Sequence, residues 1–103
     1  MNIGIIRCHS YSDNCPAGSC LKAVREKTAT FSNYAEPVLV GIDTCGGCDR
    51  GKADRISAKA RKLKDLGAEA IHFGNCLVSP CPYLELYGKA VEDLGLRLVQ
   101  GTH

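Results

Sequence analysis

The sequence contains no long hydrophobic run and no strong excess of charge of either sign. No stretch approaches the roughly 20 apolar residues that a membrane-spanning helix needs, and the amino terminus lacks the charged and apolar regions of a signal peptide. Thirteen basic residues against eleven acidic ones leave a net charge of +2. That imbalance is too small to indicate nucleic acid or an anionic membrane as a partner. We therefore expect a cytoplasmic protein that binds neither nucleic acid nor a membrane.

The length and overall composition are those of one ordinary globular domain covering residues 1–103. Hydrophobic residues make up 45% of the chain and charged residues 23%, which excludes a disordered, collagen-like or repeat protein. Seven cysteines and eleven glycines stand out against this background. Without secretion a disulfide framework is a poor explanation, and the number of cysteines is odd. The cysteines therefore indicate metal binding or thiol chemistry.

Two hydrophobic periodicities alternate along the chain. Short apolar runs predict strands at residues 2–7, 37–43, 69–74 and 96–100. Apolar positions three and four residues apart predict helices over residues 17–28, 50–66 and 82–94. Gly67 and Gly95 are placed to end the last two helices, and the long connection over residues 28–36 has room for an extra turn. The first three strands are apolar enough to be covered on both faces.

This order of elements predicts a single flavodoxin-like, three-layer α/β domain. Strand-helix-strand connections are right-handed, so the sheet should be parallel with helices on both faces. The expected strand order of the four-stranded sheet is 2-1-3-4.

The cysteines cluster in one kind of connection. Six of the seven fall in the predicted segments between a strand and the following helix, which gather at the carboxyl edge of the sheet, where such proteins bind ligands. They are Cys8, Cys15, Cys45, Cys48, Cys76 and Cys81, and His103 ends the chain just past the last strand. The strand order predicts that Cys8 and Cys76 face one another, with Cys45 and Cys48 beside Cys8.

The remaining cysteine and the other two histidines have different expected roles. Cys20 lies on the apolar face of the first helix, where packing is the better interpretation. His72 lies within the third strand and is expected to be a buried core histidine. His9 adjoins Cys8 and could either bind a metal or lower the pKa of a thiol.

Cys45, Gly46, Gly47 and Cys48 form the strongest local motif. Two cysteines three residues apart can hold one metal ion, and the glycines allow the backbone to fold around it. A second pair is supplied by Cys76 and Cys81. The spacing therefore permits a four-thiolate site from these two pairs, in which Cys8 could replace one member. Thiolates suit zinc or an iron–sulfur cluster.

Two other functions are compatible with the same motif. A Cys-x-x-Cys pair at a helix N-terminus is also a redox motif, in which Cys45 or Cys48 would be the nucleophile of a thiol enzyme and the other cysteine the resolving thiol. The amides of Gly46 and Gly47 could instead bind phosphate or another small ligand at the start of the helix.

Several motifs together resemble a known family. They are residues 1–8, Cys15 and Pro16, the Cys45 to Cys48 motif, residues 67–72, Asn75 and Cys76, Cys81 and Pro82, and the closing Gly101, Thr102 and His103. In this combination the sequence resembles the CGGC-domain family of small prokaryotic proteins over essentially its whole length. The resemblance implies a metal-binding domain, with zinc as the metal, and implies no particular reaction or substrate. It implies Cys8, Cys15, Cys45, Cys48, Cys76, Cys81 and His103 as the ligand group.

Overall fold

The computed structural model describes residues 2–8, 18–28, 31–32, 34, 36–45, 53–78 and 83–102. Strands and helices alternate along these residues as the sequence predicts. They are β1 (Asn2–Arg7), α2 (Gly18–Glu26), β2 (Val38–Thr44), α3 (Ala53–Asp65), β3 (Ala70–Phe73), α4 (Asn75–Val78), α5 (Leu84–Glu92) and β4 (Arg97–Gln100). The four strands match their predicted ranges to within one residue at each end.

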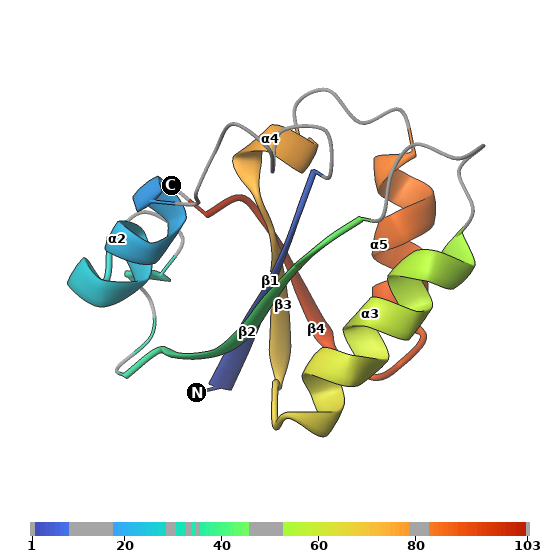
Figure 1. The fold of residues 1–103 in the computed structure, drawn as a ribbon, viewed down its shortest axis with the longest axis horizontal. Helices are drawn as coiled ribbons and strands as arrows, with labels where there is room; N and C mark the ends of the chain where they lie inside the picture. Colours follow the sequence, from blue (N-terminus) through green and yellow to red (C-terminus); the bar gives the residue numbers. More distant parts are fainter. Residues whose placement is uncertain are drawn as a thin grey trace.

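The sheet has four parallel strands in the order β2-β1-β3-β4. Figure 1 shows α2 on one side of the sheet and α3 and α5 on the other. The predicted α/β class, the strand order and the placement of helices on both faces are therefore confirmed, and the layering is of the flavodoxin type. No helix among the described residues is long and apolar enough to cross a membrane.

Each face of the sheet contributes to its own hydrophobic core, because successive residues of a strand point to opposite faces. On the α2 side the buried residues are Ile3, Ile5, Cys20, Ala23, Val24, Phe31 and Ala70. On the side of α3 and α5 they include Ile6, Cys8, Cys45, Ile56, Leu63, Ile71, Phe73, Tyr87 and Val91. Cys8 and Cys45 thus belong to a different core from Cys20.

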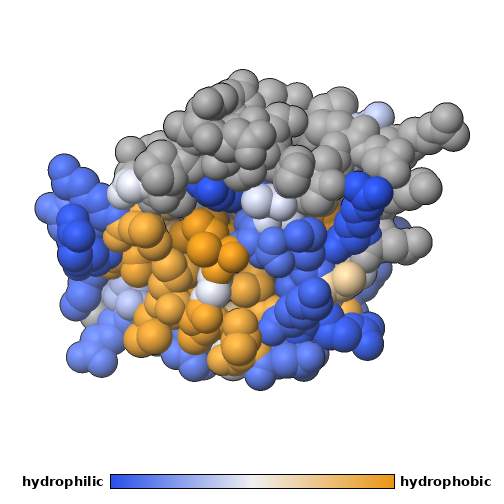
Figure 2. All heavy atoms as spheres, in the orientation of Figure 1, coloured by the Kyte–Doolittle hydropathy of each residue, from blue (hydrophilic) through white to orange (hydrophobic). Residues whose placement is uncertain are grey.

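The strands differ in burial according to their position in the sheet. The inner strands β1 and β3 are almost wholly buried, whereas β2 and β4 are partly exposed. The expectation that β2 is covered on both faces is wrong, because β2 is an edge strand: Val38 is 50% exposed and Ile42 40%. Figure 2, drawn in the same orientation as Figure 1, shows hydrophobic side chains gathered in the middle of the face toward the viewer.

The contact between α3 and the sheet depends on two glycines. A Cβ atom added at Gly41 would lie 2.7 Å from Leu63 Cδ2, and one added at Gly4 would lie 3.0 Å from Leu63 Cδ1. Both positions therefore need glycine for α3 to pack this closely. Along the same strand pair Ile3 is opposite Leu39 and Gly4 is opposite Gly41, so that Val40 is an extra residue in β2.

The ends of the helices follow the sequence signals with two exceptions. Gly67 and Gly95 adopt the positive φ angles, 104° and 80°, that end a helix. After α2 the same role falls to Lys27, with φ 55°. Leu66, the last residue of the helix predicted over residues 50–66, is 61% exposed because α3 ends at Asp65.

The connection between α2 and β2 contains the extra turn that its length allows. The Phe31 N–H donates to the Thr28 carbonyl at 3.0 Å, and the Tyr34 N–H donates to the Phe31 carbonyl at 3.2 Å. This turn brings the rings of Phe31 and Tyr34 against β3, where both contact His72.

Candidate metal centre

Cys8 and Cys45 lie at the carboxyl ends of neighbouring strands. The last residues paired between β1 and β2 are Arg7 and Thr44, and the Cys45 N–H continues the pairing by donating to the Arg7 carbonyl at 2.8 Å. Because parallel strands that end level bring their next residues together, the two cysteines are neighbours. The sequence-based placement of Cys45 beside Cys8 is confirmed.

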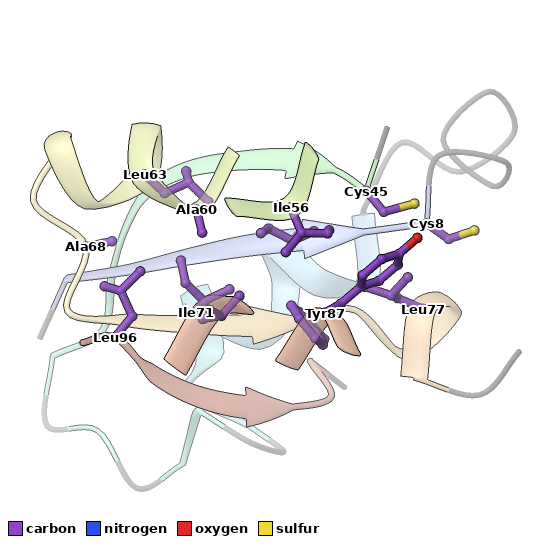
Figure 3. Close-up of a cluster of buried hydrophobic side chains, with 13 residues drawn as sticks. Cys8, Cys45, Ile56, Ala60, Leu63, Ala68, Ile71, Leu77, Tyr87 and Leu96 are labelled. Carbon is purple, nitrogen blue, oxygen red and sulfur yellow. The ribbon is translucent and has the colours of Figure 1, made fainter. Parts of the chain in front are cut away.

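Both of these cysteines are thiols and are nearly inaccessible to solvent. Cys8 is 6% exposed and Cys45 is 2% exposed. Figure 3 shows the two sulfur atoms at the same edge of the sheet, next to Leu77 and Tyr87. Two thiols from adjacent strands at this edge can supply two of the ligands of a metal site, because each can provide one thiolate.

Cys76 enters the same edge from the third strand. The Gly74 N–H donates to the Ile6 carbonyl at 2.8 Å, which ties the end of β3 to β1. The chain then turns directly into the short helix α4, which contacts β1 and contains Cys76 as its second residue. The backbone therefore places Cys76 beside the strand that carries Cys8. The sequence pattern predicts a loop at this position, where the structure has a helix.

Tyr87 is a residue near the thiols that the sequence analysis did not single out. It is 2% exposed on the inner face of α5. In Figure 3 its hydroxyl points toward the edge where Cys8 and Cys45 lie. The sequence does carry one signal for Tyr87: it occupies an apolar position of the predicted helix where an aliphatic residue would suffice. A buried tyrosine hydroxyl usually has a polar partner, so a tyrosine at such a position indicates a polar group nearby.

Gly101 and Thr102, which follow β4, are held at this edge by several hydrogen bonds. The Gly101 N–H donates to the Phe73 carbonyl at 2.7 Å, and the Thr102 N–H donates to Asn75 Oδ1 at 3.0 Å. The Thr102 hydroxyl lies 3.1 Å from Cys20 Sγ, and Thr102 is fully buried. Asn75 and Thr102 thereby connect α4 to the end of β4.

Cys20 and His72 are core residues, as expected. Cys20 is 5% exposed among the residues packed between α2 and the sheet. His72 is fully buried, with Nε2 2.7 Å from the Tyr34 hydroxyl and Nδ1 3.1 Å from the Gly101 carbonyl oxygen. Burial lowers the pKa of His72, and Arg97 lowers it further against the opposing hydrogen bond to Gly101. His72 is therefore a neutral imidazole at pH 7.

One ion pair lies close to the end of β2. Lys59 Nζ donates to Asp43 Oδ1 at 2.8 Å, and the Thr44 N–H donates to the same oxygen at 2.8 Å. Partial burial by itself would raise the pKa of Asp43, but these two hydrogen bonds, together with the positive charges of Lys59 and Lys62, outweigh it and hold the pKa below its ordinary value. The pair fixes α3 to β2 two residues before Cys45.

Several predicted site residues lie outside the described residues. They are His9, Cys15, Gly46, Gly47, Cys48, Cys81 and His103. Within the described part of the chain no group of three His, Cys, Asp or Glu side chains could hold a metal ion. The described geometry therefore brings together Cys8, Cys45 and the backbone of Cys76.

Comparisons with known proteins identify the family. The family model of the CGGC domain matches residues 2–103. An uncharacterized protein of the archaeon Methanocaldococcus jannaschii is 39% identical over 114 aligned residues, which cover 100% of this chain and 87% of the archaeal protein. No solved structure matches the chain. The family match extends over essentially the whole domain, including every strand and helix described above and both cysteines at the edge of the sheet, and so the chain belongs to the CGGC-domain family, whose cysteine content indicates metal binding.

Proposed function

We propose that this protein binds zinc through thiolates gathered at the carboxyl edge of its sheet. The observation that carries the proposal is the placement of Cys8 and Cys45 on adjacent strand ends, tied by the hydrogen bond from the Cys45 N–H to the Arg7 carbonyl. We draw the remaining ligands from Cys15, Cys48, Cys76, Cys81 and His103, which the pattern of cysteines and histidine in the sequence suggests.

The chemistry of the donors fits zinc. Thiolate and imidazole ligands in tetrahedral sets are typical of structural zinc sites, and thiolates can also hold an iron–sulfur cluster, which is the alternative cofactor. Four protein ligands would make the site structural or regulatory, whereas three would leave a position for water or a thiol. When bound, zinc would act as a Lewis acid at that open position.

The protein supplies a rigid and shielded position for the first two ligands. Cys8 and Cys45 follow strands whose register is set by the pairing of β1 with β2, and Ile56 and Leu77 pack in the same cluster. A low-polarity surrounding strengthens the attraction between a thiolate and a cation. Reduced thiols of this kind persist in the cytoplasm, where we place the protein.

A thiol enzyme that uses Cys45 and Cys48 is less well supported. A nucleophilic thiol has to reach its substrate, and such cysteines are partly exposed. Cys45 is only 2% exposed. This burial favours a ligand over a nucleophile.

Metal analysis of anaerobically purified protein tests the proposal. We expect stoichiometric zinc in colourless protein, and substantial loss of zinc in Cys8→Ser, Cys45→Ser and Cys76→Ser. Cys20→Ser is the matched control, because Cys20 is also buried but belongs to the other core, and it should retain zinc. A brown protein that contains iron would show that the cofactor is an iron–sulfur cluster instead of zinc.

Two results would overturn zinc binding by these thiolates. One is wild-type protein that contains no metal after reconstitution and shows seven titratable thiols. The other is equal zinc content in all four serine variants. Rapid alkylation of Cys45 by iodoacetamide well below pH 8 would instead favour the thiol enzyme.

A further inference from the structure

We propose that the outer surface of α3 and α5 is the interface of a homodimer, in which α3 of each copy packs against α5 of the other. The two helices lie side by side on one face of the sheet (Figure 1), with α3 on β1 and β2 and α5 on β4. Their outer sides face away from the sheet. No cysteine takes part in this surface, so the proposal is independent of metal binding.

An open groove of about 240 Å³ lies between the outer sides of the two helices. Its apolar lining consists of Leu86, Ala90 and Leu94, and Arg61 lines it from α3. Leu86 is 46% exposed, which is a large exposure for a leucine in a helix that packs on a sheet. Apolar side chains with charged residues around them are typical of the core and rim of a protein interface.

The two helices carry opposite net charge. α3 contains five basic and two acidic residues, whereas α5, counted with its C-cap Asp93, contains three acidic residues and one basic residue. Lys59 is paired with Asp43 of β2, and Lys64 donates to the Leu94 carbonyl. Among the described residues no ion pair joins α3 to α5. The opposite charges of the two helices are therefore available to a second molecule.

The charges select one of two symmetric arrangements. α3 and α5 run in the same direction, because each leads away from the carboxyl edge of a parallel sheet. A two-fold axis across the helices would place α3 on α3 and α5 on α5, so that like charges face each other. An axis along the helices places α3 of each copy on α5 of the other. Opposite charges then meet twice, and the two Leu86 side chains meet near the axis.

The charged residues lie at matching levels along the two helices. Lys64 Nζ donates to the Leu94 carbonyl at 2.7 Å, which sets the last turn of α3 level with the end of α5. Arg61 and Lys62 precede Lys64 by less than one turn, and Glu92 and Asp93 precede Leu94 by less than one turn. An axis along the helices brings residues of equal level together. Arg61 and Lys62 of one copy therefore lie within reach of Glu92 and Asp93 of the other.

Reversal of these charges, with light scattering and sedimentation under reducing conditions, tests the arrangement. We expect a wild-type dimer that is weakened by at least about 100-fold in Arg61→Glu/Lys62→Glu and equally in Glu92→Lys/Asp93→Lys, because like charges then face each other. All four residues are exposed, so both variants should fold. An equimolar mixture of the two variants should form a heterodimer, because each reversed helix then faces its complement.

Leu86→Ser tests the apolar part of the interface. We expect it to weaken the dimer by about 10-fold, since each copy loses an apolar side chain from the centre of the contact. Leu21→Ser is the matched control. Leu21 is 43% exposed, but it belongs to α2 on the opposite face of the sheet, and its substitution should leave the dimer unchanged.

Three outcomes would overturn the proposal. One is wild-type protein that stays monomeric at every attainable concentration, which would leave the groove to a helix of another protein. Another is a dimer that Leu86→Ser and Leu21→Ser weaken equally. The third is a mixture of the two charge-reversed variants that stays monomeric, because the arrangement of α3 on α5 requires that the two variants complement each other.

Discussion

The Tyr34 hydroxyl and His72 Nε2 lie 2.7 Å apart, between the turn before β2 and the centre of the sheet. The carbonyl of Gly101 can only accept, so His72 Nδ1 carries the proton that it donates there. Nε2 is then the acceptor, and the Tyr34 hydroxyl is the donor. This arrangement uses both ring nitrogens of one neutral tautomer, while Phe31 stacks on the ring with 4.3 Å between the ring centroids.

The stability of the metal-free protein should fall as the pH drops below about 6.5, the ordinary pKa of histidine. Burial, together with Arg97, lowers the pKa of His72 in the folded state, so the unfolded chain takes up the proton at a higher pH than the folded one. The contribution is complete above the unfolded pKa and is lost as the pH falls toward the folded pKa. Urea unfolding between about pH 5 and 8 measures it.

His72→Gln is the control for this pH dependence, because glutamine does not titrate. The two other histidines of the chain remain in that variant. If the variant loses stability with falling pH as steeply as the wild type, His72 is not the source.

Tyr34→Phe should destabilise the fold by about 1–3 kcal/mol, because it leaves the buried Nε2 of His72 without its donor. Burial raises the pKa of Tyr34, so the hydroxyl remains a donor throughout the neutral range. Thermal or urea unfolding gives the difference. Tyr83→Phe is the matched control: Tyr83 is half-buried next to Tyr87, and its loss of a hydroxyl should cost much less.

The ion pair between Asp43 and Lys59 should contribute on the order of 0.5–1 kcal/mol, since both side chains are partly exposed and solvent screens them. Lys59→Met removes the attraction, and the expected loss of stability is smaller in 1 M salt. The pKa of Asp43 is lowered, so this contribution should also disappear as the pH falls below the ordinary carboxylate range.

The exposed pair of Lys22 and Glu26 provides a comparison within the same chain. Lys22 Nζ lies 3.9 Å from Glu26 Oε2, whereas Lys59 Nζ lies 2.8 Å from Asp43 Oδ1. Lys22→Met should therefore change the free energy of unfolding by only a few tenths of a kcal/mol. An equal effect of both lysine substitutions would contradict the interpretation of the Asp43 pair.

Gly4→Ala should destabilise the domain by about 1–3 kcal/mol through overpacking. The added methyl group would lie 3.0 Å from Leu63 Cδ1, 3.1 Å from Ile71 Cδ1 and 3.2 Å from Leu63 Cβ, all in the crowded interior. Gly18→Ala makes the same chemical change at the start of α2, where nothing lies within 4 Å. There the higher helix propensity of alanine should leave stability unchanged or slightly increased.

Much of the fold could be predicted because its signals are local. The apolar runs mark the strands, and the right-handed crossover rule converts their order into a topology with β1 and β3 in the middle. The exposure of β2 was missed because an edge strand of hydrophobic residues has the same pattern as an inner one. The helix α4 was missed because its four residues are too short to show a periodicity.

The sequence predicts at which edge of the sheet the candidate site lies, but not the contacts between its residues. The positions of Cys8 and Cys45 follow directly from the predicted strand ends. The contacts of Thr102 with Asn75 and Cys20 join segments far apart in the sequence, and no local sequence pattern predicts them. The orientation of Tyr87 depends in the same way on how α5 packs against the sheet.

The extra residue Val40 in β2 has a consequence for how the molecule behaves among its own copies. An exposed, regular and hydrophobic edge strand is a template on which a strand of another chain can add. The bulge at Val40 interrupts the regular ladder of β2 halfway along its seven residues and increases the local twist. A foreign strand would therefore meet two short, differently directed segments instead of one straight edge, which disfavours its addition to β2.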